Sequence, residues 1–64
     1  MKTYDEIKQK AYRLYLKSFK VDNNQLASSM QSRADMLLSF VLEMNSDEMD
    51  EVWEAAQAEY EKNA

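Results

Sequence analysis

Neither glycine nor proline occurs in this chain of 64 residues. Glycine supplies most left-handed backbone positions and the close backbone approach of phosphate-binding loops, and proline favours sharp turns. A chain without them is poorly suited to β-hairpins and nucleotide-binding loops. We therefore expect helices joined by short connectors of Asn, Asp and Ser, with Asn or Asp at any left-handed position.

Cysteine and histidine are absent as well. A chain of this size buries only about 60% of the surface that its unfolded form exposes, so small folds usually depend on a disulfide, a metal or a second chain. The missing cysteines exclude disulfides and thiolate metal sites, and the missing histidines remove the commonest transition-metal ligand. We expect no metal site and no cofactor, which leaves helix packing and self-association as sources of stability.

Apolar residues recur at helical spacing in three stretches that short polar segments separate. These stretches predict helices at about 3–20, 23–44 and 46–62. Helices of this length joined by tight turns fold most simply as an antiparallel three-helix bundle. We therefore expect an all-α fold in which residues 1–64 form a single domain.

Each predicted helix begins with residues suited to capping its first backbone N–H groups. Thr3 with Glu6 has the spacing of a capping box, and so has Asn45 with Glu48 at the third helix. Any residue of the polar run 22–24 is suited to cap the second helix. These positions locate the helix starts more sharply than the apolar periodicity does.

The second predicted helix is apolar around most of its circumference. Leu38 and Leu42 extend its apolar face on one side, and Met36 and Phe40 extend it on the other. Such a helix is expected at the centre of a bundle or in contact with a second chain. A homodimer through this helix would use a seam with steps of three and four residues. The residues of that seam are Met30, Ala34, Leu37, Val41 and Met44.

Charge is sorted along the chain. Residues 1–21 hold six basic and two acidic side chains, whereas residues 46–64 hold one basic and seven acidic side chains. The first helix carries a basic stripe of Lys10, Arg13, Lys17 and Lys20. One side of the third helix carries an acidic cluster of Asp47, Asp50, Glu51, Glu54 and Glu61.

Three interpretations of this charge pattern stay open. The first is that the stripe and the cluster face each other inside the bundle, where separated like charges help to select one topology. The second is that the acidic cluster binds a basic partner by imitating the phosphates of a nucleic acid. The third is that the basic stripe binds nucleic acid directly, which the net charge of −4 and the pI of about 4.6 argue against.

A second apolar stripe lies on the first helix, away from its main apolar face. It consists of Tyr12, Leu16 and Phe19, at the spacing i, i+4 and i+7. A bundle core widened by aromatic rings would absorb these residues. Alternatively they form a protein-binding surface, because contiguous exposed apolar side chains mark interfaces and aromatic residues anchor them.

The sequence predicts no enzyme. The candidate nucleophiles are Ser, Thr, Tyr and Lys, and neither His nor Cys is present to activate or replace them. Acidic pairs such as Asp47 with Glu51 fall on a helix side that we expect to be solvated, where no scaffold assigns one carboxyl as acid and the other as base. No catalytic residue is assigned.

The start of the chain has no basic head followed by an apolar run, so we expect no secretory signal. The longest apolar-rich stretch, residues 36–44, is too short to span a bilayer and contains Ser39 and Glu43. We expect a cytoplasmic protein without a membrane partner.

Size, acidity and the lack of Gly, Pro, Cys and His resemble those of the small accessory proteins carried by phages and other mobile elements. This resemblance implies a module that regulates or inhibits a larger protein partner, and a homodimer is the expected state. The predicted partner-binding residues are the second apolar stripe and the acidic cluster. The alternatives are a nucleic-acid-linked regulator, acting as a mimic or as a direct DNA binder through the first helix, and a structural or assembly subunit.

Overall fold

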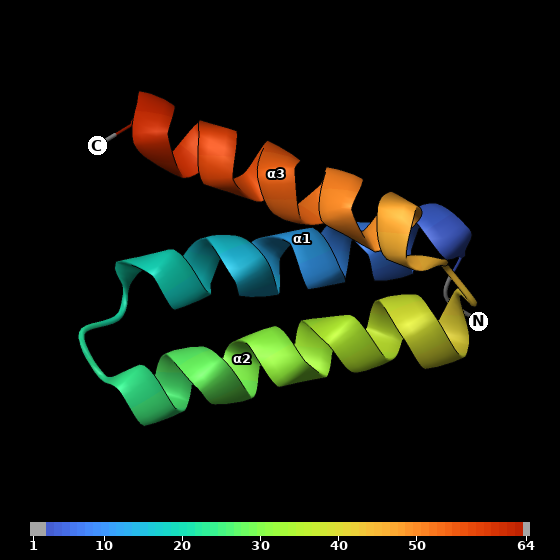
Figure 1. The fold of residues 1–64 in the computed structure, drawn as a ribbon, viewed down its shortest axis with the longest axis horizontal. Helices are drawn as coiled ribbons and strands as arrows, with labels where there is room; N and C mark the ends of the chain where they lie inside the picture. Colours follow the sequence, from blue (N-terminus) through green and yellow to red (C-terminus); the bar gives the residue numbers. More distant parts are fainter. Residues whose placement is uncertain (1–2, 64) are drawn as a thin grey trace.

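A computed structural model describes residues 3–63 and contains three helices that run alternately up and down (Figure 1). Helix α1 spans Tyr4–Lys20 and helix α2 spans Asn24–Met36. A π-helical turn, η1, continues α2 over Leu37–Val41, and helix α3 spans Ser46–Lys62. The prediction of an all-α, antiparallel three-helix bundle is confirmed.

Side chains cap the start of each helix, as the sequence predicts. Asn45 and Glu48 form the complete capping box of α3: Asn45 Oδ1 accepts a hydrogen bond from the Glu48 N–H at 2.9 Å, and Glu48 Oε1 accepts one from the Asn45 N–H at 3.2 Å. Thr3 caps α1 and Asn23 caps α2, each accepting a bond from the backbone N–H three residues later. Each cap satisfies backbone donors that have no partner within the helix.

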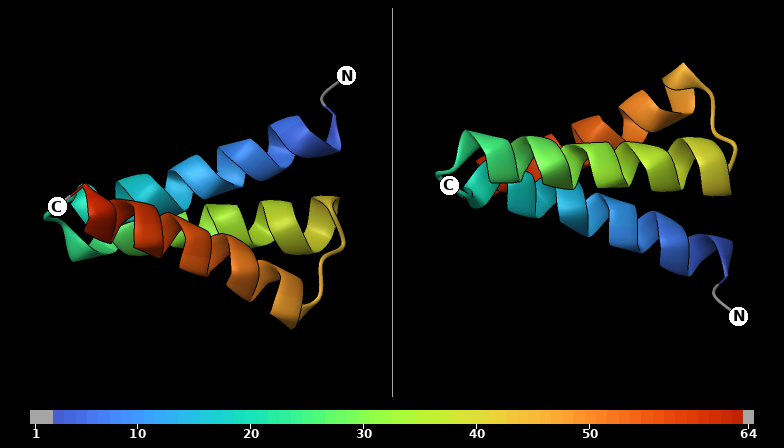
Figure 2. Two further views of the ribbon diagram at one scale, coloured as in Figure 1. Left: turned by 90° about the horizontal axis from the view of Figure 1, so that it is seen from above. Right: turned by 90° about the horizontal axis from the view of Figure 1, so that it is seen from below.

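Helix α1 is the central helix of the bundle. It packs against both α2 and α3, whereas α2 and α3 contact each other much less. Figure 2 shows that the helices converge where α1 turns into α2 and spread apart toward the other end. The apolar circumference of the second predicted helix suggested either a central place in the bundle or contact with a second chain. The first alternative is wrong, and the second stays a prediction.

One hydrophobic core joins the three helices. Tyr15 and Leu38 are its largest fully buried side chains. Trp53 packs edge-on against Tyr15 and against Phe19, with ring centroids 5.2 Å and 4.9 Å apart, an arrangement that aromatic pairs favour. Alanines complete the core where helices approach closely. The buried core consists of Ala11, Tyr15, Ala34, Leu38, Met44, Val52 and Ala56.

The seam predicted for a homodimer does not form one accessible surface. Ala34 and Met44 are buried in the core, and Leu37 packs against it. Met30 is half-buried, and only Val41 is exposed. The predicted seam is therefore split between the inside and the outside of the bundle.

The bundle buries one edge of the apolar face of α2 and leaves the other edge outside. Leu38 lies in the core and Leu42 packs against it, while Met36 and Phe40 are exposed. Periodicity places the centre of an apolar face but not the part that a neighbouring helix covers, because α2 is apolar over more of its circumference than one contact uses.

The end of the second helical segment uses a left-handed residue that is neither Asn nor Asp. Glu43 has φ 53°, and the following residue, Met44, donates its N–H to the carbonyl of Leu38 at 2.9 Å. This bond spans six residues, one more than the five of a π-helical bond. The expectation of Asn or Asp at such a position is wrong here, since the left-handed residue is Glu43.

Buried polar groups are satisfied within the described residues. Ser18 donates a hydrogen bond to the carbonyl of Tyr15 at 2.6 Å and accepts one from the side-chain amide of Gln31 at 3.1 Å. This second bond joins α1 to α2. Within residues 3–63 no buried side-chain nitrogen or oxygen lacks a hydrogen-bond partner, as expected of a well-packed interior.

Candidate functional site

An apolar groove lies between α1 and the second helical segment. Its volume is about 330 Å³, and α3 contributes no residue to it. We call it the Phe40 groove. It is lined by Lys10 and Leu14 from α1 and by Arg33, Met36, Leu37, Phe40 and Val41 from α2 and η1.

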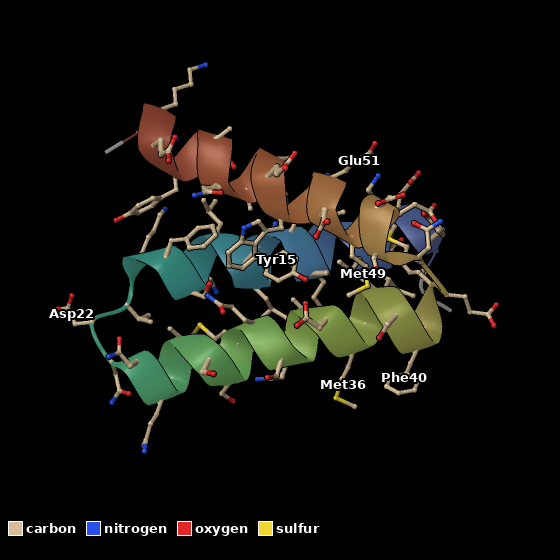
Figure 3. The ribbon with its side chains drawn as sticks, viewed as in Figure 1. Tyr15, Asp22, Met36, Phe40, Met49 and Glu51 are labelled. Atoms are coloured by element: carbon tan, nitrogen blue, oxygen red, sulfur yellow. The ribbon has the colours of Figure 1, made fainter. Side chains whose placement is uncertain are left out.

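The outer wall of the Phe40 groove is unusually exposed for apolar side chains. Phe40 is 76% exposed, Met36 58% and Val41 54%. Figure 3 shows Met36 and Phe40 pointing away from α3 and from the interior of the bundle. Leu14 and Leu37 pack against the core and form the floor.

These exposed residues differ from isolated apolar residues on the surface. Leu26, which is 47% exposed, and Tyr4 belong to other parts of the molecule and do not line the groove. Single exposed apolar residues are common, whereas neighbouring ones around a hollow mark binding surfaces. Met36 and Phe40 lie one helical turn apart, so they present a continuous edge.

The Phe40 groove is bordered by positive charge. Lys10 stands on its α1 wall and Arg33 on its α2 wall. A neighbouring hollow of about 550 Å³ shares Lys10 and Leu14 with the groove and extends along α1 past Arg13 and Lys17. Glu6 is the one acidic residue that lines either hollow. This side of the molecule therefore carries positive charge in a chain whose net charge is −4.

The acidic cluster lies on the solvent side of α3. All five of its members, Asp47, Asp50, Glu51, Glu54 and Glu61, are exposed. Figure 3 shows Glu51 pointing outward from α3. The cluster is thus accessible. Two of its members line hollows, Asp50 a cleft beside Met49 and Trp53, and Glu51 a furrow beside Tyr12 and Val52.

One residue of the basic stripe lines a hollow together with another helix, and that helix is not α3. Lys10 borders α2, not α3. The furrow of about 440 Å³ between α1 and α3 is lined instead by Asp5, Lys8 and Glu51, among other residues. The structure therefore does not pair Lys10 with the acidic cluster, and for the other residues of the stripe the internal charge match stays a prediction.

The second apolar stripe faces α3. The Tyr12 hydroxyl donates a hydrogen bond to Glu59, and this bond raises the pKa of Tyr12. Phe19 packs against Trp53, and Leu16 is half-buried. Of the two interpretations of this stripe, the structure confirms the wider core for Tyr12 and Phe19. Helix α3 therefore covers most of the surface that was predicted to bind a partner.

A small cleft opens between α2 and α3 where these helices diverge. It has a volume of about 240 Å³ and is lined by Tyr15, Asp35, Asp50 and Trp53, together with residues at the start of α3. The Tyr15 hydroxyl donates a hydrogen bond to Asp35. Burial is the main cause that raises the pKa of Tyr15, and the bond to Asp35 adds to it. The hydrogen bond in this cleft joins α1 to α2.

Sequence reasoning missed the Phe40 groove although it noted the residues of its outer wall. The signal was the surplus of apolar residues on both flanks of α2, only one of which a single neighbouring helix can cover. Lys10 and Arg33 could not be assigned to a common site from the sequence, because they are 23 positions apart on different helices.

Comparison with known proteins found no match: no protein-family model fits the chain, and neither a curated protein nor a solved structure is detectably similar to it. Among residues 3–63, no three acidic side chains gather into a group that could hold a metal ion. The helices described here lack the length and apolar character that a membrane crossing requires.

Proposed function

We propose that this protein is a helical module that binds a larger protein and regulates or inhibits it, and that the Phe40 groove is its binding surface. The observation that carries the proposal is the exposure of Phe40, Met36 and Val41 around a hollow with an apolar floor. Fully burying one such side chain contributes about 1.5–3 kcal/mol. A bound partner would gain this burial, whereas the isolated chain forgoes it.

The chemistry of the groove favours recognition over catalysis. Its polar members are Lys10 and Arg33, which supply charge and hydrogen-bond donors but no paired acid and base. Aromatic side chains and arginine are the residues that most often dominate binding energy in protein interfaces. Phe40 and Arg33 would fill these roles here.

The acidic cluster supports a second candidate function. Its five exposed carboxylates give α3 a negative surface that a basic site on another protein could bind in place of a nucleic acid. Such binding would weaken steeply as the salt concentration rises, because it rests on exposed charges. Binding through the Phe40 groove would depend less on salt, because it rests on apolar contact.

One set of variants separates the two functions. We expect Phe40→Ala to weaken partner binding by about 30-fold, the effect of removing a strong interface anchor. Leu26→Ala is the matched control, because Leu26 lies on the same helix and is also exposed but does not line the groove. A third variant, D47N/D50N/E54Q, removes three carboxylates from the acidic cluster.

The measurement is quantitative affinity capture from the native host, followed by titration of the captured protein with each purified variant. Far-UV circular dichroism confirms that every variant keeps its helices. A partner that binds Phe40→Ala as tightly as the parent protein would refute the role of the groove. A partner lost only with the D47N/D50N/E54Q variant would establish the second function instead.

A further inference from the structure

We infer that the Phe40 groove accepts an acidic amphipathic helix from its partner. This inference rests on the proposed function, because it names the kind of surface that the groove recognises. Two observations support it: the shape of the groove suits a helix, and its border is positively charged although the protein as a whole is acidic.

The shape of the groove suits a helix. Its walls are two antiparallel helical segments, with Lys10 and Leu14 one turn apart on α1, and with Met36 of α2 one turn from Phe40 of η1. A helix laid into such a groove inserts apolar residues at positions i and i+3 or i+4. Because α3 contributes nothing to the groove, a docked helix would pack against α1 and α2 on a side that α3 leaves open and would complete a four-helix arrangement.

An extended peptide fits the same surface poorly. Strand addition requires an edge whose backbone N–H and carbonyl groups are unpaired. The groove walls are formed by α1, α2 and η1, which are helical and offer no strand edge of this kind. Recognition must therefore come from side chains, which is how a groove binds a helix.

The charge around the groove selects an acidic helix. Lys10 and Arg33 stand on opposite walls, so carboxylates on both flanks of an inserted apolar strip would each meet a cation. Arg13 and Lys17 extend the positive surface along α1. The acidic cluster on α3 is not part of this surface. This separation of charge would orient an acidic partner toward the groove as it approaches.

A second copy of this chain is a weaker candidate. A symmetric dimer through the groove would place Lys10 and Arg33 of one copy close to the same residues of the other, and like charges in an interface are unfavourable. A head-to-tail copy would offer α3, but within residues 3–63 all the large exposed apolar residues lie outside α3. Its acidic cluster would supply charge without an apolar anchor.

Nucleic acid is also a weaker candidate. Its binding rests on neutralising several phosphates, and this surface offers Lys10, Arg13, Lys17 and Arg33 against a net charge of −4 for the whole chain. The groove itself is mainly apolar, with two cations among seven lining residues. An acidic amphipathic helix would contact both the apolar side chains and the cations of the groove, whereas a phosphate backbone would contact only the cations.

The test is a selection of helical peptides displayed from a random library against the immobilised full-length protein. We expect the enriched peptides to carry apolar residues one turn apart with Asp and Glu beside them. Replacing those Asp and Glu residues with Lys in a synthetic copy is expected to weaken binding by about tenfold, because attraction to two cations becomes repulsion. Titration by fluorescence anisotropy measures the change.

Charge reversal in the protein gives the sharper test. The double variant K10E/R33E is expected to invert the preference, so that it binds the Lys-containing peptide more tightly than the acidic one. Phe40→Ala is expected to weaken both peptides, and Leu26→Ala neither. An unchanged preference in K10E/R33E would overturn the inference.

The same experiment separates this inference from the proposed function. Peptides that bind through Phe40 without a preference for acidic residues would overturn the acidic helix and leave a protein-binding groove. Tighter binding of a single-stranded or duplex oligonucleotide, lost in K10E/R33E, would overturn it in favour of nucleic acid. Self-association that Phe40→Ala abolishes, measured by sedimentation at micromolar concentration, would overturn it in favour of a second copy.

Discussion

The two phenylalanines of this chain sit in contrasting surroundings. Phe19 lies on the side of α1 that α3 covers, where it packs edge-on against Trp53. Phe40 lies at the groove between α1 and α2, where it is 76% exposed. Both belong to apolar patterns of helical spacing, so their hydrophobicity does not distinguish them. The comparison shows that α3 covers one surface and that no helix among residues 3–63 covers the other.

The polar groups beside the two surfaces differ as well. On the covered side, the hydroxyls of Tyr12 and Tyr15 donate hydrogen bonds to the carboxylates of Glu59 and Asp35. Beside Phe40, by contrast, stand the cations of Lys10 and Arg33. The covered side therefore satisfies its polar groups internally, whereas the groove presents donors that would suit the carboxylates of a partner.

The strongest test of this comparison deletes apolar atoms inside and outside the bundle. Leu38→Ala is expected to lower the free energy of unfolding by about 2–5 kcal/mol, because Leu38 is fully buried and its loss leaves a cavity. A 64-residue protein has a total stability of about 3–10 kcal/mol, so this variant should lose a large share of it. Urea denaturation followed by circular dichroism measures the change.

The matched control for Leu38→Ala is Phe40→Ala, which removes a larger side chain from the same helical segment. Because Phe40 is exposed, we expect the free energy of unfolding to stay within about 0.5 kcal/mol of the parent value. A decrease in the free energy of unfolding comparable to that of Leu38→Ala would show that Phe40 belongs to the core, and would contradict the contrast between the two surfaces.

An intermediate effect is expected from Tyr15→Phe and from pH. The raised pKa of Tyr15 means that the folded state keeps its phenolic proton at a pH where the unfolded state releases it. The resulting stability is fully present below the ordinary tyrosine pKa of about 10 and is lost as pH rises through the higher folded value. We expect the urea midpoint of the parent protein to fall at alkaline pH.

Tyr15→Phe should flatten that alkaline decline and should lower stability by about 1 kcal/mol at neutral pH, through loss of the hydrogen bond to Asp35. Tyr12→Phe should flatten it less, because Tyr12 remains partly accessible. Phe40→Ala should leave it unchanged, since no tyrosine lines the groove. An equally steep decline in Tyr15→Phe would show that other groups cause it.

The smallest expected effect concerns the end of η1, next to the groove. Glu43 adopts the left-handed conformation, which asparagine tolerates better than glutamate does. Glu43→Asn is expected to raise the free energy of unfolding by about 0.5–1 kcal/mol. Glu43→Gln removes the charge without relieving the backbone and should change nothing. Equal stabilisation by both variants would assign the effect to charge.

Local features of the fold followed from the sequence because their causes are local. The capping box of Asn45 and Glu48 requires only residues three positions apart, and it places the start of α3 within one turn. The cap at Thr3 does the same for α1. The lack of glycine and proline favoured helices throughout. The left-handed Glu43 was not predicted, because the demand for it arises where two helical segments join.

The sequence by itself determined the helices, their caps and the presence of more apolar surface on α2 than one neighbour can bury. Only the tertiary structure decided that α1 is the central helix, that α3 covers Tyr12 and Phe19, and that Met36 and Phe40 stay outside. The physical reason is that periodicity reports which residues share a helix face. The contacts between helices decide which part of that face is buried, and those contacts depend on all three helices together.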